Sequence, residues 1–109
     1  MTLPLRTLVT VPPQASRGQI IWIRALAQHP MENGFRHNEN GQRISRNLLT
    51  DFVCQYNGVE VFRAKLHTGV AANPLIEFTT VATESGELVF EWRDGQGQSA
   101  WAQARLEVV

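Results

Sequence analysis

The sequence has no excess of either charge and no long hydrophobic run. Its 109 residues contain ten Lys and Arg against ten Asp and Glu, so the formal net charge is zero. A chain without a positive field is not expected to bind nucleic acid in general. The longest apolar stretch, 19–27, is interrupted by Arg24 and is shorter than the roughly 20 residues that cross a bilayer. We therefore expect neither a nucleic-acid partner nor a membrane partner.

The beginning of the chain lacks the features of a secretory signal. It has no basic region, and Pro4 and Arg6 interrupt the apolar core that a signal peptide needs. Composition alone therefore predicts a cytoplasmic protein. Cysteine usage adds nothing about the compartment, because a single cysteine cannot form an intrachain disulfide.

Few residues offer catalytic chemistry, and Cys54 is the most obvious of them. In an extended strand Cys54 shares a face with Phe52 and Tyr56, where a small apolar residue usually fills the core. Its sequence neighbours Val53 and Gln55 carry no positive charge that would lower the thiol pKa. A cationic residue on a neighbouring strand is still possible, but we expect Cys54 to be a core residue.

The remaining polar residues form no recognisable site. His29, His37, His67 and Glu32 lack the close spacing of zinc or iron ligands. The sequence has no nucleophile elbow, phosphate-binding loop or dinucleotide fingerprint. We predict a protein that is not an enzyme, with no catalytic residue, no metal site and no cofactor.

What the sequence does contain is the material for a packed core: 43% hydrophobic residues, three Trp and five Phe. Its length suits one domain, which we place at 1–109. Apolar residues alternate with period two, and turn residues recur about every ten positions. This pattern predicts antiparallel strands over seven segments: 7–11, 19–27, 50–56, 59–66, 75–81, 87–93 and 99–108.

Alternation also predicts which side chains face inward. Leu88, Phe90 and Trp92 share one face of their strand, and the alanines of 99–108 share one face with Leu106 and Val108. Asn57-Gly58 predicts a two-residue hairpin turn, because both residues tolerate a positive φ.

Seven short strands favour an all-β sandwich of immunoglobulin-like type, with a small closed barrel as the alternative. Trp22 and Trp92 have no disulfide to pack on, so the likeness to antibody domains is architectural only.

Residues 29–36 place Met31 and Phe35 among polar residues directly after a strand. Two interpretations stay open. The loop folds its apolar residues over the end of the sandwich, or it forms an adaptable surface that contacts a partner.

Four motifs in order, HPMENGFR (29–36), FVCQYNGVEVFRAKLH (52–67), AANP (71–74) and ATESGELVFEWRDGQG (82–97), resemble the SoxZ family of the bacterial sulfur-oxidising system. The resemblance extends from about Gly18 to the end of the chain. One departure is Thr68, where a proline is expected after the histidine, and it bears only on the stiffness of that loop.

The resemblance implies a non-catalytic subunit with an immunoglobulin-like fold. Its partner would be a SoxY-type carrier that holds sulfur intermediates on a C-terminal cysteine while other sulfur-oxidising enzymes process them, starting from compounds such as thiosulfate. The carrier role itself is not expected here, because Cys54 lies within a strand and the chain ends without glycines or a cysteine. The resemblance also implies a periplasmic location, reached by export together with the carrier, and we prefer it to the compositional expectation.

We therefore expect a heterodimeric scaffold for the carrier. The alternatives are a free-standing immunoglobulin-like binding module and, less favoured, a thiol enzyme that uses Cys54 with a histidine. The predicted partner-binding residues are His29, Met31, Phe35, Arg36, Arg63, Asn73 and Pro74.

Alanine at Phe35 or at Arg36 is expected to weaken heterodimer formation, because aromatic and arginine side chains often carry most of an interface's binding energy. The affinity of each variant for the carrier measures the effect. Unchanged affinity in both variants would remove this loop from the interface.

Overall fold

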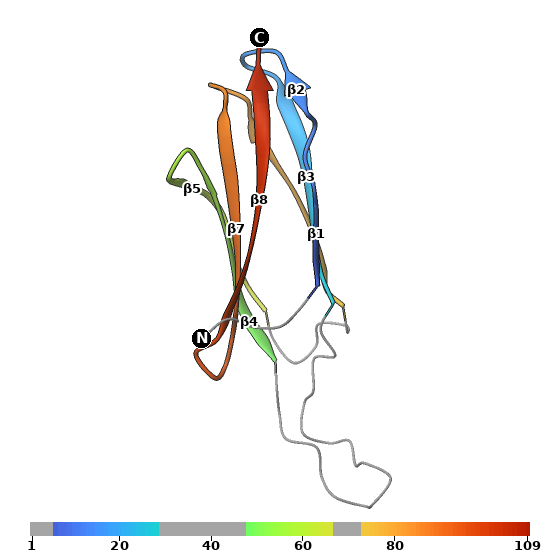
Figure 1. Ribbon diagram of the computed structural model, residues 1–109, viewed down its shortest axis with the longest axis vertical. Coiled ribbons are helices and arrows are strands. Elements are labelled where there is room, and N and C mark those ends of the chain that lie inside the picture. Colours follow the sequence, from blue (N-terminus) through green and yellow to red (C-terminus); the bar gives the residue numbers. More distant parts are fainter. Residues whose placement is uncertain (1–5, 29–47, 67–72) are drawn as a thin grey trace, which may run out of the picture.

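The described residues are 6–28, 48–66 and 73–109 of a computed structural model; they form eight β-strands and no helix (Figure 1). The strands are β1 (Thr7–Thr10), β2 (Gln14–Ala15), β3 (Ile20–Ala27), β4 (Leu49–Tyr56), β5 (Val59–Lys65), β6 (Leu75–Val81), β7 (Gly86–Asp94) and β8 (Ser99–Val108). The seven expected strands are confirmed to within one residue at every end. Within these segments no helix could cross a membrane.

The strands form two sheets that pack against each other. One sheet has the order β1-β3-β6, and the other has the order β2-β8-β7-β4-β5. All pairings are antiparallel except that of β2 with β8. Figure 1 separates them, with β1 and β3 on one side and β5, β7 and β8 on the other. The all-β immunoglobulin-like sandwich is therefore confirmed, and the alternative of a closed barrel is not.

Between β1 and β2 the chain passes from the smaller sheet to the larger one, at Pro12-Pro13. Neither proline has an N–H to donate to a ladder, so β1 ends before them and the chain crosses to the other sheet. There Gln14 and Ala15 pair with the end of β8, and the Glu107 N–H donates to the Pro13 carbonyl at 3.1 Å. Sequence analysis missed β2, because a two-residue strand has no periodicity to detect.

Aromatic rings join the two sheets in the core. The Phe62 ring of β5 stacks on Phe78 of β6, with centroids 4.3 Å apart and planes at 8°. The fully buried Phe52 of β4 lies 6.1 Å from Phe78 and 5.2 Å from Trp92 of β7. Residues from both sheets therefore meet at Phe52.

The predicted inward faces are confirmed. Leu88, Phe90 and Trp92 are fully buried. Along β8 the inward face consists of Ala100, Ala102, Ala104, Leu106 and Val108, all buried or half-buried. The two tryptophans considered together in the sequence differ, since Trp92 is in the core while Trp22 is 64% exposed.

The predicted Asn57-Gly58 turn is confirmed and joins β4 to β5. Asn57 has φ of 50° and Gly58 of 81°, the two positive values that the tightest hairpin turn requires. The Asn57 side chain also accepts a hydrogen bond from the Glu87 N–H at 3.2 Å. The turn is thus attached to the start of β7.

Tyr56, just before this turn, ties the hairpin to the segment between β6 and β7. Its hydroxyl accepts hydrogen bonds from the N–H groups of Thr83 (3.2 Å) and Glu84 (3.1 Å) and donates to the Glu84 carbonyl. The ring is buried, so these groups bond at the margin of the core.

Tyr56→Phe is expected to lower the free energy of unfolding by about 1–3 kcal/mol, because two backbone N–H groups lose their acceptor while the ring stays in place. Urea denaturation followed by fluorescence measures the change. A loss below about 0.3 kcal/mol would mean that water replaces the hydroxyl at little cost.

Candidate functional site

Cys54 lies in the core, which confirms the prediction that it fills space there. Its side chain is 0% exposed within the cluster around Phe52 and Phe90. Burial raises the thiol pKa to about 12, because a thiolate would lose its solvation there. At neutral pH the sulfur is therefore protonated and shielded from reagents.

The histidines of the suggested metal or thiol site, His29, His37 and His67, lie outside the described residues together with Glu32. Within the part of the chain that the structure describes, no three His, Cys, Asp or Glu side chains gather closely enough to hold a metal ion. The absence of a metal site therefore stays a prediction.

Three of the seven predicted partner-binding residues are described. Asn73 (φ 54°) and the buried Pro74 directly precede β6, and the Pro74 carbonyl accepts a hydrogen bond from the Ala27 N–H at the end of β3. Arg63 lies on β5, in the other sheet, so the structure does not bring it together with this pair. The other four, His29, Met31, Phe35 and Arg36, fall outside the described residues.

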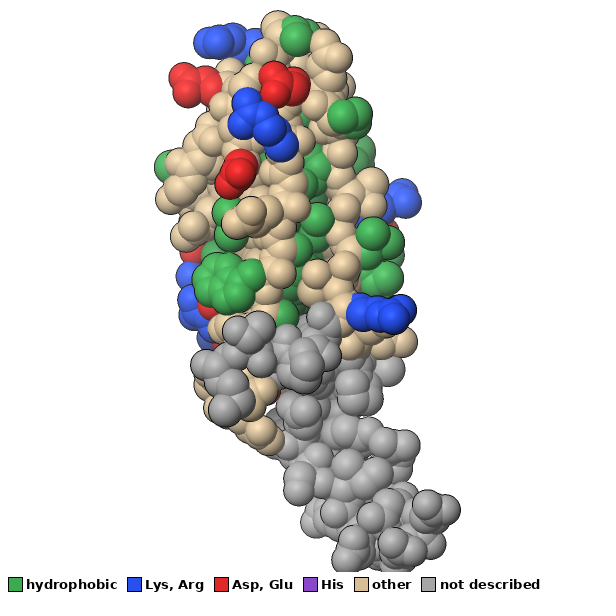
Figure 2. All heavy atoms as spheres, viewed as in Figure 1, with side chains coloured by type: hydrophobic (Ala, Val, Ile, Leu, Met, Phe, Trp, Pro, Cys, Tyr) green, Lys and Arg blue, Asp and Glu red, His purple; other side chains and the backbone are tan. Residues whose placement is uncertain are grey.

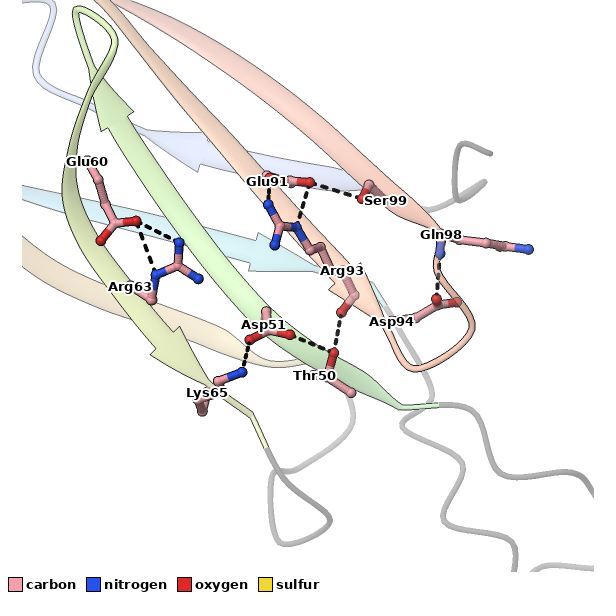
Figure 3. A network of polar contacts seen from close by, with 10 residues as sticks. All are labelled: Thr50, Asp51, Glu60, Arg63, Lys65, Glu91, Arg93, Asp94, Gln98 and Ser99. Carbon is pink, nitrogen blue, oxygen red and sulfur yellow. Dashed lines mark hydrogen bonds and ion pairs between the residues drawn. The ribbon is translucent and has the colours of Figure 1, made fainter.

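The outer face of the larger sheet carries a network of ion pairs (Figure 3). Arg63 pairs with Glu60 at 2.7 Å, and Lys65 with Asp51 at 2.8 Å. Further along, Arg93 donates two hydrogen bonds to Glu91, at 2.8 and 2.9 Å.

Two of these contacts favour the ionised form of a carboxylate. The hydrogen bond from Lys65 lowers the pKa of Asp51, and the hydrogen bonds from Arg93 lower the pKa of Glu91. Arg105 and Glu107 form a further pair at 2.9 Å on β8. This outer surface, the charged face, is suited to contact with water.

The outer face of the smaller sheet is different, and we call it the β1–β3–β6 face. Its members point outward at alternate positions of three paired strands: Leu8, Thr10, Ile20, Trp22, Arg24, Leu26, Leu75, Glu77, Thr79 and Val81. Figure 2 shows hydrophobic side chains along the margin that β1 and β3 form in Figure 1.

Register brings the apolar members of this face together. Ile20 lies opposite Val81 at one end, and Leu26 lies between Leu8 and Leu75 at the other. Leu8, Ile20, Trp22, Leu75 and Val81 are all exposed, and they make up most of the large apolar side chains that the described residues expose. The face is thus an apolar surface left open to solvent.

Sequence analysis did not find this face, although β3 contains a signal for it. Ile21 and Ile23 point into the core, while Ile20 and Trp22 point outward from the same strand. A strand that is apolar on both faces is usually buried on both, so the exposed outward pair is unusual and resembles the apolar patches found at interaction sites.

The raised thiol pKa gives a testable stability profile. In the unfolded chain the thiol of Cys54 has its ordinary pKa near 9. The folded state therefore binds the thiol proton more tightly than the unfolded state does. Below pH 9 the thiol is protonated in both states and its burial costs no stability. Between pH 9 and about 12 the thiol ionises only in the unfolded state, so the free energy of unfolding falls progressively. Urea titrations from pH 8 to 10.5 are expected to show a decline that Cys54→Ala lacks; parallel profiles of the two proteins would contradict the burial of the thiol.

Comparison with known proteins identifies both a family and a fold. Residues 9–105 match the family described as "Sulphur oxidation protein SoxZ". None of the curated proteins matches the chain.

Solved structures of similar fold include superoxide reductases and a sulfur carrier protein. Superoxide reductase (neelaredoxin) from Ignicoccus hospitalis aligns with a TM-score of 0.72 and 17% identity, over 96% of this chain and 82% of that one. A putative superoxide reductase from Thermotoga maritima aligns with a TM-score of 0.72 and 11% identity, over 94% and 85%. The sulfur carrier protein SoxY from Chlorobium limicola f thiosulfatophilum aligns with a TM-score of 0.65 and 12% identity, over 94% and 78%.

At these identities the structural likenesses show the shared fold alone. The family match is of a different kind, because it covers nearly the whole chain, including all four motifs. On that match, the chain belongs to the SoxZ family of sulphur oxidation proteins.

Proposed function

We propose that this chain is the non-catalytic subunit of a SoxYZ-type carrier complex. It would scaffold a SoxY-type protein that holds sulfur intermediates covalently on its C-terminal cysteine during the oxidation of thiosulfate and related compounds. The observation that carries the proposal is the SoxZ family match over residues 9–105. The superoxide reductase likenesses, at 11–17% identity, add only the fold.

The chemistry of the described residues supports a binding role. Cys54, the one cysteine in the sequence, is buried and protonated, so it is poorly placed to attack or carry a sulfur compound. The exposed apolar β1–β3–β6 face is the kind of surface that protein partners cover. We propose no catalytic residue and no cofactor.

The proposed assembly is a heterodimer with the SoxY-type carrier, located in the periplasm and exported together with the carrier. In it the scaffold would also present part of the surface that the processing enzymes meet. The predicted partner contacts remain His29, Met31, Phe35, Arg36, Arg63, Asn73 and Pro74. Of these, Pro74 lies beside the end of β3, where its carbonyl accepts a hydrogen bond from the Ala27 N–H.

The test is light scattering behind a sizing column, on this chain alone and mixed with the SoxY-type protein of the same cell. A one-to-one species at micromolar concentration is expected. A reducing agent, and a carrier alkylated at its C-terminal cysteine, keep disulfide crosslinks from imitating a complex. Separate elution of the two proteins would reject the scaffold and favour a free-standing immunoglobulin-like binding module.

A further inference from the structure

We propose that the β1–β3–β6 face is the surface that receives the SoxY-type subunit, an inference that rests on the proposed function. A scaffold needs one extended surface that can lose its water when the partner binds. The described residues form two outer sheet faces, and the free energy needed to desolvate them differs sharply.

Drying the charged face means desolvating several ion pairs. Asp51 with Lys65, Glu60 with Arg63, Glu91 with Arg93, and Arg105 with Glu107 all lie there. Removing ion pairs from water costs free energy that their mutual attraction seldom repays in full. A partner therefore gains little by covering this face, and the present proposal leaves Arg63, a predicted contact that lies on it, outside the main interface.

The β1–β3–β6 face holds a single ion pair. Arg24 lies opposite Glu77 in the register, and its Nε atom is 3.1 Å from the carboxylate. The two charges cancel within the face, so nothing on it attracts an anionic polymer or a charged lipid surface. The matching partner is a neutral, largely apolar protein surface with a polar group able to meet this pair.

Apolar side chains lie on both sides of that ion pair. Trp22 (64% exposed) and Ile20 (66%) lie toward one end, and Leu8 (63%) with Leu75 (53%) at the other. Aromatic residues such as Trp often supply much of the binding energy of an interface, and the core of an interface is apolar and depleted of charged groups. The composition of this face matches an interface core.

The area of the face sets a requirement on the partner. Seven positions of β3 pair with β6, roughly 23 Å of strand, and three strands span roughly 14 Å. The flat sheet therefore offers roughly 300 Å², less than half of the roughly 800 Å² that each side of a typical stable complex buries. A partner must extend beyond the sheet.

Two apolar hollows lie where that extension is needed. Beyond the β6 edge, a groove is lined by Val59 and Val61 together with Ile20 and Val81 of the face. Near β1, a second hollow is lined by Val11, Pro12 and Pro13 beside Trp22 and Arg24. Because both hollows share residues with the face, a subunit as large as a SoxY-type domain can cover all three surfaces continuously.

Two exposed tryptophans provide a matched test. Trp22 belongs to the β1–β3–β6 face, while Trp101, 55% exposed, points outward from β8 on the opposite sheet. Isothermal titration with the SoxY-type carrier is expected to show Trp22→Glu binding at least about 100-fold more weakly than the unaltered chain. Trp101→Glu is expected to stay within about threefold of it.

Leu75→Glu, at the other end of the face, tests the proposal independently of Trp22. Circular dichroism and urea denaturation check that each variant keeps its fold, as expected for exposed positions. Loss of binding in both face variants with an unaffected Trp101→Glu supports the proposal.

Three results would overturn it. Loss of binding in Trp101→Glu alone would place the carrier on the larger sheet and leave the proposed function intact. If the unaltered chain binds no carrier, the proposed function itself fails. If the chain self-associates, and Trp22→Glu abolishes only that association while carrier binding is unchanged, a second copy occupies the face instead.

Discussion

Aromatic packing between the two sheets is the interaction on which the rest of this structure depends. Phe52 of β4 contacts rings from both sheets, and the stacked pair of Phe62 and Phe78 joins the edge strands β5 and β6. Since the sandwich has no disulfide to hold its sheets together, these buried rings supply that link through apolar burial and close ring contacts. Because side chains alternate along each strand, this inner packing also fixes which residues face outward.

The same packing explains why the outer faces have separate roles. In the larger sheet, β4 and β7 are central strands with a buried inner side. On their outer side Asp51 of β4 pairs with Lys65 of β5, and Glu91 pairs with Arg93 within β7. In the smaller sheet, the central strand β3 is apolar on its outer side as well. A sandwich needs only one apolar face on each sheet, the inner one. This smaller sheet also exposes an apolar outer face. Folding alone gives no reason for it, whereas the proposed partner would.

The location of Cys54 separates this family member from carrier chemistry in physical terms. A sulfur carrier requires a thiol that can ionise and reach a reagent, and burial among apolar side chains removes both properties. The strand alternation already placed this residue beside Phe52 and Tyr56, so its protection follows from local sequence. The suggested thiol pairing with a histidine concerns residues beyond the described ranges.

The sequence by itself determined the seven longer strands, the Asn57-Gly58 turn and the inner faces of β7 and β8. Along 87–93 of β7 and along β8 one side is wholly apolar, while on the other Val89 and Trp101 stand among charged and polar residues, so alternation indicates which side is buried. Only the tertiary structure decided the outer role of β3, because Ile20 and Ile21 are equally apolar and alternation cannot tell which one faces water. It also decided the pairing of β2 with β8. Two residues are too few to show a strand pattern, and their partner lies some ninety positions along the chain.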